Sequence, residues 1–213
     1  MSRAFLRAAA LCITLSSLAG AAYTDAVSLD VFMQNRTRIQ SQACSLARQA
    51  AAHYLRYGTT EFKGPDLPEI FNRKAAVFVT ISKDGQRRGC RGSFEPAEDT
   101  LKAEIIRVAI EAATADIRYR PIRLGELDEL AFSVSIVGEP EIVSDLDGFC
   151  PTRCGLLLRS GEKSGVLLPG EAKTNTWQLA EAKRQAGVQP GEPYELYVFE
   201  TVALHETRPP EAK

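Results

Sequence analysis

AVFVTISKDGQRRGCRGSF, residues 76–94, combines an apolar run, a tight turn and a polar return segment. The run 76–81 is rich in branched residues and is typical of a β-strand. The Asp-Gly pair at 84–85 lies between two strand-like segments, which is a strong hairpin signal. The stretch therefore predicts an antiparallel hairpin whose second strand, 86–94, carries Cys90.

Side chains along the second strand are expected to alternate between the two faces of the sheet. Strict alternation places residues 88, 90, 92 and 94 on one face and residues 87, 89, 91 and 93 on the other. Arg88 is therefore predicted to be the nearest neighbour of Cys90 on its own face. A helix is expected close behind this strand, because proline and acidic residues at 95–100 precede an apolar pattern at 101–113.

The rest of the chain predicts further helices and strands in an irregular order. Apolar residues recur at helical spacing from Ile39 to Tyr54, ahead of Gly58. A short helix surrounds Trp177, and strand-like runs lie at 131–138, 156–158, 166–168 and 194–202. Strands joined by hairpins, with helices inserted between them, predict an α+β fold with a mainly antiparallel sheet and flanking helices.

The first 21 residues have the three parts of a secretory signal. Arg3 and Arg7 form a basic start, residues 8–18 an apolar run, and residues 19–21 a small-residue cleavage site. The sequence therefore predicts an exported protein, periplasmic or secreted, that loses this signal peptide (1–21). The remaining chain is expected to comprise an N-terminal segment (22–38), one domain (39–205) and a C-terminal tail (206–213).

Charge and hydropathy argue against two classes of partner. Removal of the signal peptide takes two of the 26 lysines and arginines and none of the 27 acidic residues, so the net charge falls from −1 to −3. A chain with that charge has no general attraction for nucleic acid. The apolar run at 8–18 is too short to span a bilayer comfortably, so no membrane association is expected after cleavage.

Four cysteines remain after cleavage, and two of them are close in sequence. Cys150 and Cys154 are a disulfide candidate in an oxidising compartment. A zinc site would need further ligands at compatible spacing, and the histidines, His53 and His205, belong to no such cluster. The sequence therefore predicts neither a metal nor another cofactor.

Three stretches, in this order and spacing, resemble the AMMECR domain family, which includes the bacterial AmmeMemoRadiSam system protein A. The first is RGCRGSF at 88–94, and the second is AATADIRYRP at 112–121, followed by Glu-Leu at 126–127 and FSVS at 132–135. The third is LLP at 167–169, followed by Trp177 and Ala-Gly at 186–187. The similarity covers roughly residues 39–205.

The resemblance implies a fold with a larger and a smaller lobe. It also implies that the Arg-Gly-Cys-x-Gly segment forms a functional surface between them. Family members are associated with a Memo-type protein and with a radical S-adenosylmethionine enzyme, so a Memo-type partner is implied here. The iron–sulfur chemistry of the second protein belongs in a reducing cytosol, so an exported copy is expected to act without it.

Two functions fit the cysteine segment. In the favoured one, the chain is an exported binding or accessory module that grips an unknown protein partner or a small anionic ligand. Glycines allow close approach and arginine forks recognise carboxylate or phosphate, so the candidate binding residues are Arg88, Gly89, Arg91, Gly92, Asp116, Arg118 and Arg120.

The alternative is a thiol-dependent enzyme that acts on an anionic substrate with Cys90 as its nucleophile. Arg88 and the start of the next helix would then lower the pKa of the thiol. A third interpretation assigns only packing to this segment, with the glycines allowing tight contact and Cys90 buried as a small apolar residue. The three interpretations make different demands on the surroundings of the thiol.

Overall fold

The computed structural model describes residues 29–206, and the predicted hairpin lies at its centre. Strands β1 (Val77–Lys83) and β2 (Gln86–Gly92) pair antiparallel. Asp84 and Gly85 between them both have positive φ, as a two-residue turn that matches the strand twist requires. The hairpin prediction is confirmed, although β2 ends two residues earlier than expected.

A β-bulge interrupts the alternation of side chains along β2. Ser82 lies opposite Arg87 but Ile81 lies opposite Gly89, so Arg88 is an extra residue without a partner on β1. Cys90 lies opposite Thr80, on the same face of β1 as Ser82. Arg87, and not Arg88, is therefore the neighbour of Cys90 on its own face, and the prediction from strict alternation was wrong.

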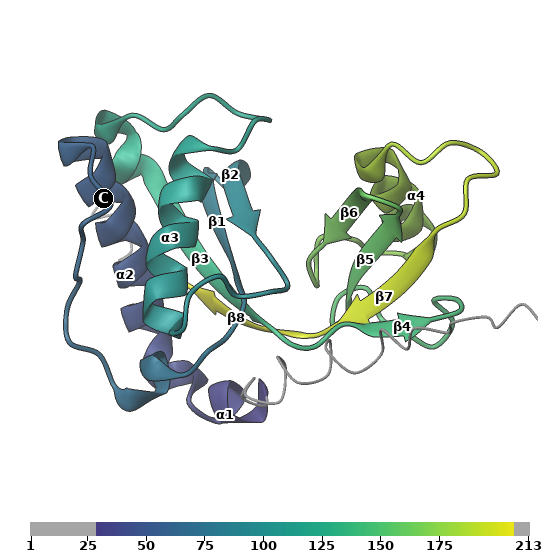
Figure 1. Cartoon of the computed structure of the whole chain (residues 1–213), viewed down its shortest axis with the longest axis horizontal. Coiled ribbons are helices and arrows are strands. Elements are labelled where there is room, and N and C mark those ends of the chain that lie inside the picture. Colours follow the sequence, from purple (N-terminus) through teal and green to yellow (C-terminus); the bar gives the residue numbers. More distant parts are fainter. Residues whose placement is uncertain (1–28, 207–213) are drawn as a thin grey trace, which may run out of the picture.

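The larger lobe is built on a four-stranded antiparallel sheet in the order β2-β1-β3-β8, with β3 (Leu130–Val137) and β8 (Thr201–His205). Helices α2 (Arg36–Tyr57) and α3 (Leu101–Thr114) cover one face, as Figure 1 shows. The core lies between these layers, where residues such as Val79 and Ile105 are fully buried. The short helices α1 (Leu29–Gln34), η1 (Glu69–Asn72) and η2 (Leu124–Glu129) complete this lobe.

The start of α3 and the end of α2 lie where the sequence predicts them. The Thr100 hydroxyl accepts a hydrogen bond from the N–H of Ala103 and so caps the start of α3. Gly58 follows α2 in the left-handed conformation that commonly ends helices. Local signals of this kind act within a few residues, which is why the sequence alone reveals them.

The smaller lobe has a second antiparallel sheet in the order β4-β7-β5-β6. Its strands are β4 (Glu141–Val143), β5 (Gly155–Ser160), β6 (Lys163–Leu167) and β7 (Glu195–Phe199), and helix α4 (Asn175–Ala186) packs on it. A separate group of buried side chains, including Leu156, Leu158 and Ala182, fills the space between them. The α+β prediction is confirmed, with two sheets in place of one.

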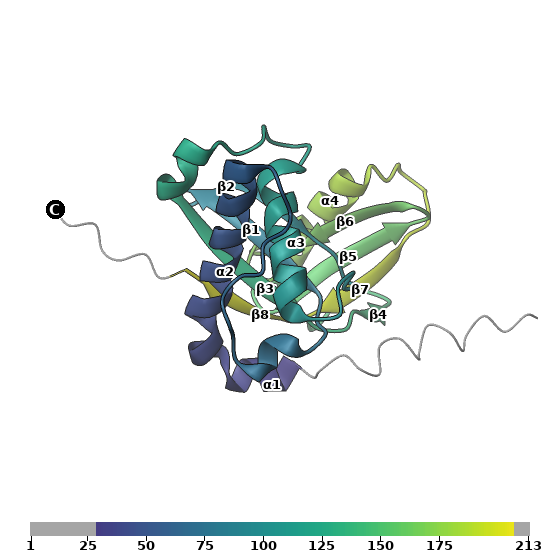
Figure 2. The same ribbon diagram turned by 60° about the vertical axis from the view of Figure 1, so that its left-hand side comes forward.

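The chain crosses between the lobes twice. The single strand predicted at 194–202 is in fact two strands, because β7 and β8 belong to different sheets and are separated only by Glu200. The other crossing leads from β3 to β4, and there the N–H of Gly138 donates to the carbonyl oxygen of Glu200 at 3.0 Å. Figure 2 shows β7 continuing into β8 from one lobe to the other.

A third apolar cluster joins the two lobes. Phe78 and Phe94 of the larger lobe pack with Leu157, Leu168 and Phe199 of the smaller one. The ring centroids of Phe94 and Phe199 lie 4.7 Å apart in an edge-to-face arrangement.

Within residues 29–206, no helix is long and apolar enough to cross a membrane. The predicted signal peptide lies outside the described residues.

Candidate functional site

Cys90 lies on the face of the larger sheet that is turned toward the smaller lobe. Its thiol is partly buried and accepts a hydrogen bond from the hydroxyl of Thr80, with Oγ1 and Sγ 3.3 Å apart. The main chain of Cys90 is held as well. Its N–H donates to Oδ2 of Asp116 at 2.8 Å, and its carbonyl oxygen accepts from Nη2 of Arg118 at 3.1 Å.

Asp116 and Arg118 form a clamp on this edge of β2. The Asp116 side chain is only 4% exposed and accepts from Nε and Nη2 of Arg118 at 2.9 and 2.8 Å. Burial by itself opposes ionisation of this carboxyl, but the bonds from Arg118 and from the N–H of Cys90 outweigh it and lower its pKa to about 2. The clamp is therefore charged at neutral pH.

Arg88 is directed away from the thiol, toward the loop that follows α3. Its guanidinium donates to the carbonyl oxygens of Arg120 and Pro121 at 2.5 and 3.3 Å, and to Oε2 of Glu126 at 2.9 Å. Arg120 contributes its carbonyl to this contact, while its residue surface is exposed. Of the candidate binding residues, Asp116 and Arg118 bond the main chain of Cys90, whereas Arg88 bonds the main-chain carbonyl of Arg120.

The two glycines beside Cys90 permit close packing. A Cβ atom at Gly89 would collide with the carbonyl oxygen of Ala112, in the last turn of α3. A Cβ atom at Gly92 would collide with the main chain of β1 at Val77 and Phe78. Glycine at 89 lets α3 lie close against β2, and glycine at 92 lets the end of β2 lie close against β1.

The environment of the thiol raises its pKa above the ordinary value. Burial is the main cause, and the Thr80 hydroxyl, Arg87 and Arg118 oppose it. The start of α3 does not contribute, since the contact of Gly89 with Ala112 places the other end of the helix beside β2. The expectation that Arg88 and a helix start lower the pKa of Cys90 was therefore wrong. Arg88 is the extra residue of the bulge and is directed away from the thiol, and the end of α3 that lies beside β2 is its C-terminal end.

A cleft of about 250 Å³ lies between Cys90 and the smaller lobe. Three arginines, Arg87, Arg91 and Arg118, line it together with a single carboxylate, that of Glu171. The remaining lining residues are apolar or neutral, and come from β1, β2, β6 and α4 and the segments next to them: Phe78, Cys90, Gly92, Ser164, Val166, Leu168 and Gln185. The cleft is thus positively charged on balance.

An ion pair bridges the cleft from one lobe to the other. Nη2 of Arg87 bonds Oε1 of Glu171, whose other oxygen accepts from the N–H of Leu168 at 3.1 Å. The remaining N–H groups of Arg87 and Nη1 of Arg118 form no hydrogen bond with a described residue. Their side chains are 29% and 48% exposed, so both guanidinium groups have donors available to a ligand.

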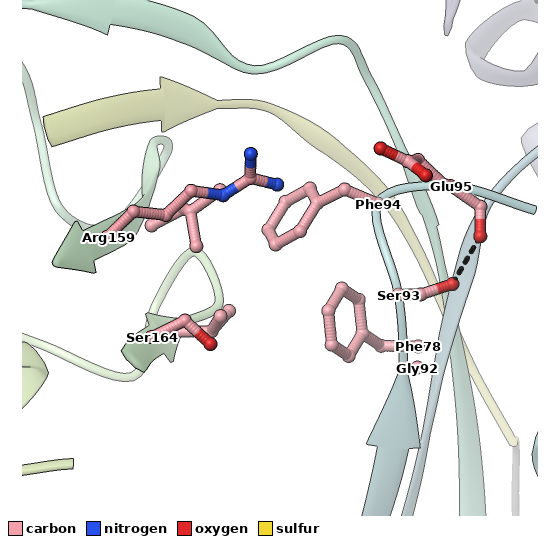
Figure 3. Close-up of a pocket in the computed structure, with 9 residues that line it drawn as sticks. Phe78, Gly92, Ser93, Phe94, Glu95, Arg159 and Ser164 are labelled. Atoms are coloured by element: carbon pink, nitrogen blue, oxygen red, sulfur yellow. Dashed lines mark hydrogen bonds between the residues drawn. The ribbon is translucent and has the colours of Figure 1, made fainter. Parts of the chain in front are cut away.

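A second hollow of about 360 Å³ continues the cleft past Gly92. Figure 3 shows the rings of Phe78 and Phe94 on one side of it, and Arg159 and Ser164 on the other. Phe78, Gly92, Ser164 and Val166 line both hollows, so the two form one groove. The hollow beside Cys90 is cationic on balance, and the second hollow is lined by apolar side chains together with one arginine, Arg159, and one carboxylate, Glu95.

Several residues of this groove were missed by the sequence analysis. Arg87 was assigned to the opposite face, and nothing pointed to Glu171, Ser164 or Phe78. The contact between the lobes brings these side chains together from distant parts of the chain, and no local pattern encodes such a contact. One signal of the bulge was present in the sequence. Gly89 is the single glycine of 86–91, a glycine inside a strand often marks a bulge, and a Cβ atom there would collide with α3.

The other candidates from the sequence lie elsewhere. Cys150 and Cys154 lie in the smaller lobe, away from the groove, and their disulfide stays a prediction. His53, on α2, packs against the ring of Phe62 in a tilted arrangement, and neither it nor His205 lines the groove. Among residues 29–206, no group of three or more histidine, cysteine or acidic side chains is placed to hold a metal ion.

Comparisons with known proteins extend these observations. A protein of Thermotoga maritima is 39% identical over 140 residues, which cover 64% of this chain and 80% of that relative. A protein of Methanothermobacter thermautotrophicus is 35% identical over 176 residues, covering 76% and 91%. A relative in Clostridium acetobutylicum is 36% identical over 160 residues, but these span only 34% of its length.

The fold has a counterpart among solved structures. The crystal structure of the protein PH0010 from Pyrococcus horikoshii superposes with a TM-score of 0.70 at 29% identity, and covers 77% of this chain and 89% of that one. The family model named AMMECR1 matches residues 44–204, which include both lobes and the whole groove. The chain therefore belongs to the AMMECR1 family.

Proposed function

We propose that the protein is a binding module that takes an anionic ligand into the groove between its lobes, beside Cys90. The observation that carries this proposal is the lining of the cleft by three arginines and one carboxylate. Guanidinium groups bind carboxylate and phosphate through paired N–H donors. Arg87 uses one nitrogen in its bond to Glu171 and keeps its other donors for a ligand, while Arg118 keeps the donors of Nη1. A ligand would replace the contact between Arg87 and Glu171 or add to it.

The surroundings of the thiol favour binding over catalysis. A nucleophilic cysteine needs a base beside it or a lowered pKa. Burial raises the pKa of Cys90, and no described histidine lines the cleft. Cys90 then serves as part of the wall, with its main chain fixed by the clamp of Asp116 and Arg118.

Titration calorimetry with inorganic phosphate at low ionic strength tests the proposal. Arg87→Ala removes a donor and leaves the charge of Glu171 unopposed, so we expect phosphate to bind at least about tenfold more weakly. Glu171→Gln removes the single lining carboxylate and releases Arg87, so we expect tighter binding. Opposite effects of the two substitutions would support the cleft as the site.

A matched control separates the cleft from the overall charge. Arg38→Ala changes the net charge by the same amount as Arg87→Ala, but it lies exposed on α2, across the sheet from the cleft. We expect it to leave phosphate binding unchanged. Equal weakening by Arg38→Ala and Arg87→Ala, or no binding by the unaltered protein, would refute the proposal.

We further propose that the protein acts outside the cytoplasm. The resemblance implies a protein partner of the Memo type for it there. The motivation for export is the secretory pattern of residues 1–21. Expression in a Gram-negative host should yield periplasmic protein whose first residue is Ala22. Recovery of an uncleaved chain from the cytoplasm alone would contradict export.

A further inference from the structure

We infer that the ligand of the groove is an extended acidic peptide whose main chain pairs with the free edge of β6 at Ser164. The inference rests on the proposed anion site and identifies the class of molecule that carries the anion. It is supported by the sheet edges that border the groove, by their uncapped main-chain groups, and by the order of charged and apolar side chains along the groove.

Both sheets present an edge strand to the groove. β2 is the outer strand of the larger sheet and β6 is the outer strand of the smaller one. Residues of both strands line both hollows, and Figure 1 shows the two strands facing each other between the lobes. An edge strand carries unpaired N–H and C=O groups, which a further strand can bond.

Side chains cap these edges at two positions. On β2, Asp116 and Arg118 bond the outward N–H and C=O of Cys90. On β6, Oε1 of Gln185 accepts from the N–H of Val166 at 3.3 Å. The caps show which residues point outward, because ladder bonds alternate along an antiparallel strand and residues two apart point the same way.

The same alternation identifies the uncapped positions. On β6, Ser164 lies two residues before Val166, so its N–H and C=O point away from β5. On β2, Gly92 lies two residues after Cys90, so its N–H and C=O point away from β1. Neither residue has a hydrogen bond from these groups to another described part of the chain. Both line the groove in both hollows. The main chain is therefore open to a ligand where the groove runs past it.

The side chains of the groove suit a peptide with alternating residues. An apolar side chain would lie against Phe78, Phe94 and Leu157, and Figure 3 shows the rings of Phe78 and Phe94 at this hollow. An acidic side chain would lie in the hollow beside Cys90, near Arg87 and Arg118. A polynucleotide would also offer anions, but it has no main-chain amide to pair with Ser164, and the chain is net negative.

The test begins with a library of blocked pentapeptides that carry glutamate at the second and fourth positions and every apolar residue at the third. Binding to the full chain would be measured by fluorescence anisotropy, with a lysine-for-glutamate library as the charge control. We expect members of the acidic library to bind and the basic library to fail. Absence of binding by every acidic member would overturn the inference.

The main-chain contact is tested by methylating each peptide amide in turn. A methyl group removes one N–H donor and leaves the side chains intact, so we expect at least about tenfold weaker binding for the amides that face β6. A scan in which every methylated peptide binds within about twofold of the parent would overturn strand pairing. This measurement does not depend on any protein variant folding.

Two substitutions at one position provide the complementary test. Ser164→Pro removes the outward N–H, which an edge strand tolerates, whereas Ser164→Ala retains it and removes only the hydroxyl. We expect peptide binding to fall at least about tenfold for proline and to persist for alanine, in proteins with the circular dichroism of the parent. Equal binding by both variants would overturn the inference.

These results separate the peptide from the anion site itself. If phosphate binding depends on Arg87 while peptide binding ignores methylation and Ser164→Pro, the anion site stands and strand pairing fails. If phosphate and all peptides fail to bind, the proposed function fails together with the inference.

Discussion

Arg87 and Arg88 are adjacent in the sequence but serve different parts of the molecule. Arg87 lies on the face of Cys90 and bridges to Glu171 of the other lobe, while Arg88 binds the loop carbonyls of Arg120 and Pro121. The bulge alone separates their roles, because one extra residue reverses the direction of every side chain beyond it. A pattern of alternation cannot reveal this without knowledge of the neighbouring strand.

Cys90 should react slowly with thiol reagents. Burial raises the pKa of Cys90, whereas a hydrogen bond with the Thr152 hydroxyl lowers that of Cys150. Alkylation by iodoacetamide at neutral pH, followed by peptide mass spectrometry on reduced protein, should therefore modify Cys150 well before Cys90. Modification of Cys90 faster than a free model thiol would contradict the binding interpretation and revive the thiol enzyme.

Asp116 should stabilise the fold in a pH-dependent manner. Its pKa of about 2 lies below the ordinary value of 3.8, so its contribution is complete above that ordinary value and is lost as the pH falls through about 2. We expect Asp116→Asn to lower the free energy of unfolding by about 2 kcal/mol at neutral pH. Urea unfolding should show the two proteins converging near the lower value, and a constant difference would contradict the clamp.

At the scale of elements, the contact between β2 and α3 depends on Gly89. The methyl group of an alanine would meet the rigid carbonyl of Ala112, so Gly89→Ala should lower the free energy of unfolding by about 1–3 kcal/mol. Gly125→Ala is the control, because a Cβ atom there has open space around it. Urea titrations that give equal stabilities for the two variants would refute the close contact.

The elements themselves were largely predictable from the sequence. The turn at Asp84 and Gly85, the cap at Thr100 and the helix end at Gly58 are local signals, and each is present in the structure. The division of residues 194–202 between two sheets was not predictable. The sequence indicates one continuous strand there, and only Glu200 separates β7 from β8. Which sheet a strand joins depends on distant partners.

For the whole molecule, the aromatic cluster between the lobes should couple their unfolding. Phe94 is 8% exposed and packs between Phe78 and Phe199. Phe94→Ala should therefore lower the free energy of unfolding by about 3–5 kcal/mol, all of it from the contact between the lobes. Scanning calorimetry should show one transition for the parent and two for the variant. Trp177→Ala, at an exposed position on α4, should keep the single transition. A single unshifted transition for Phe94→Ala would contradict coupling through this cluster.

The site was predictable only where it lies within one lobe. Asp116 and Arg118 were candidate binding residues, and the segment that follows α3 brings both into hydrogen bonds with the main chain of Cys90. Glu171 and Ser164 could not be anticipated, because they reach the groove through the packing of the second lobe on the first. A site formed between lobes is a property of the assembled fold.

The central claim, that the groove beside Cys90 binds an anion through Arg87, has a direct spectroscopic test. In protein labelled with ¹⁵N-arginine, the Nε resonances of Arg87 and Arg88 can be assigned from single substitutions and followed as inorganic phosphate is added. We expect the Arg87 resonance to shift in a saturable manner while that of Arg88, held by Arg120 and Glu126, stays in place. A saturable shift at Arg88 with none at Arg87 would contradict the account.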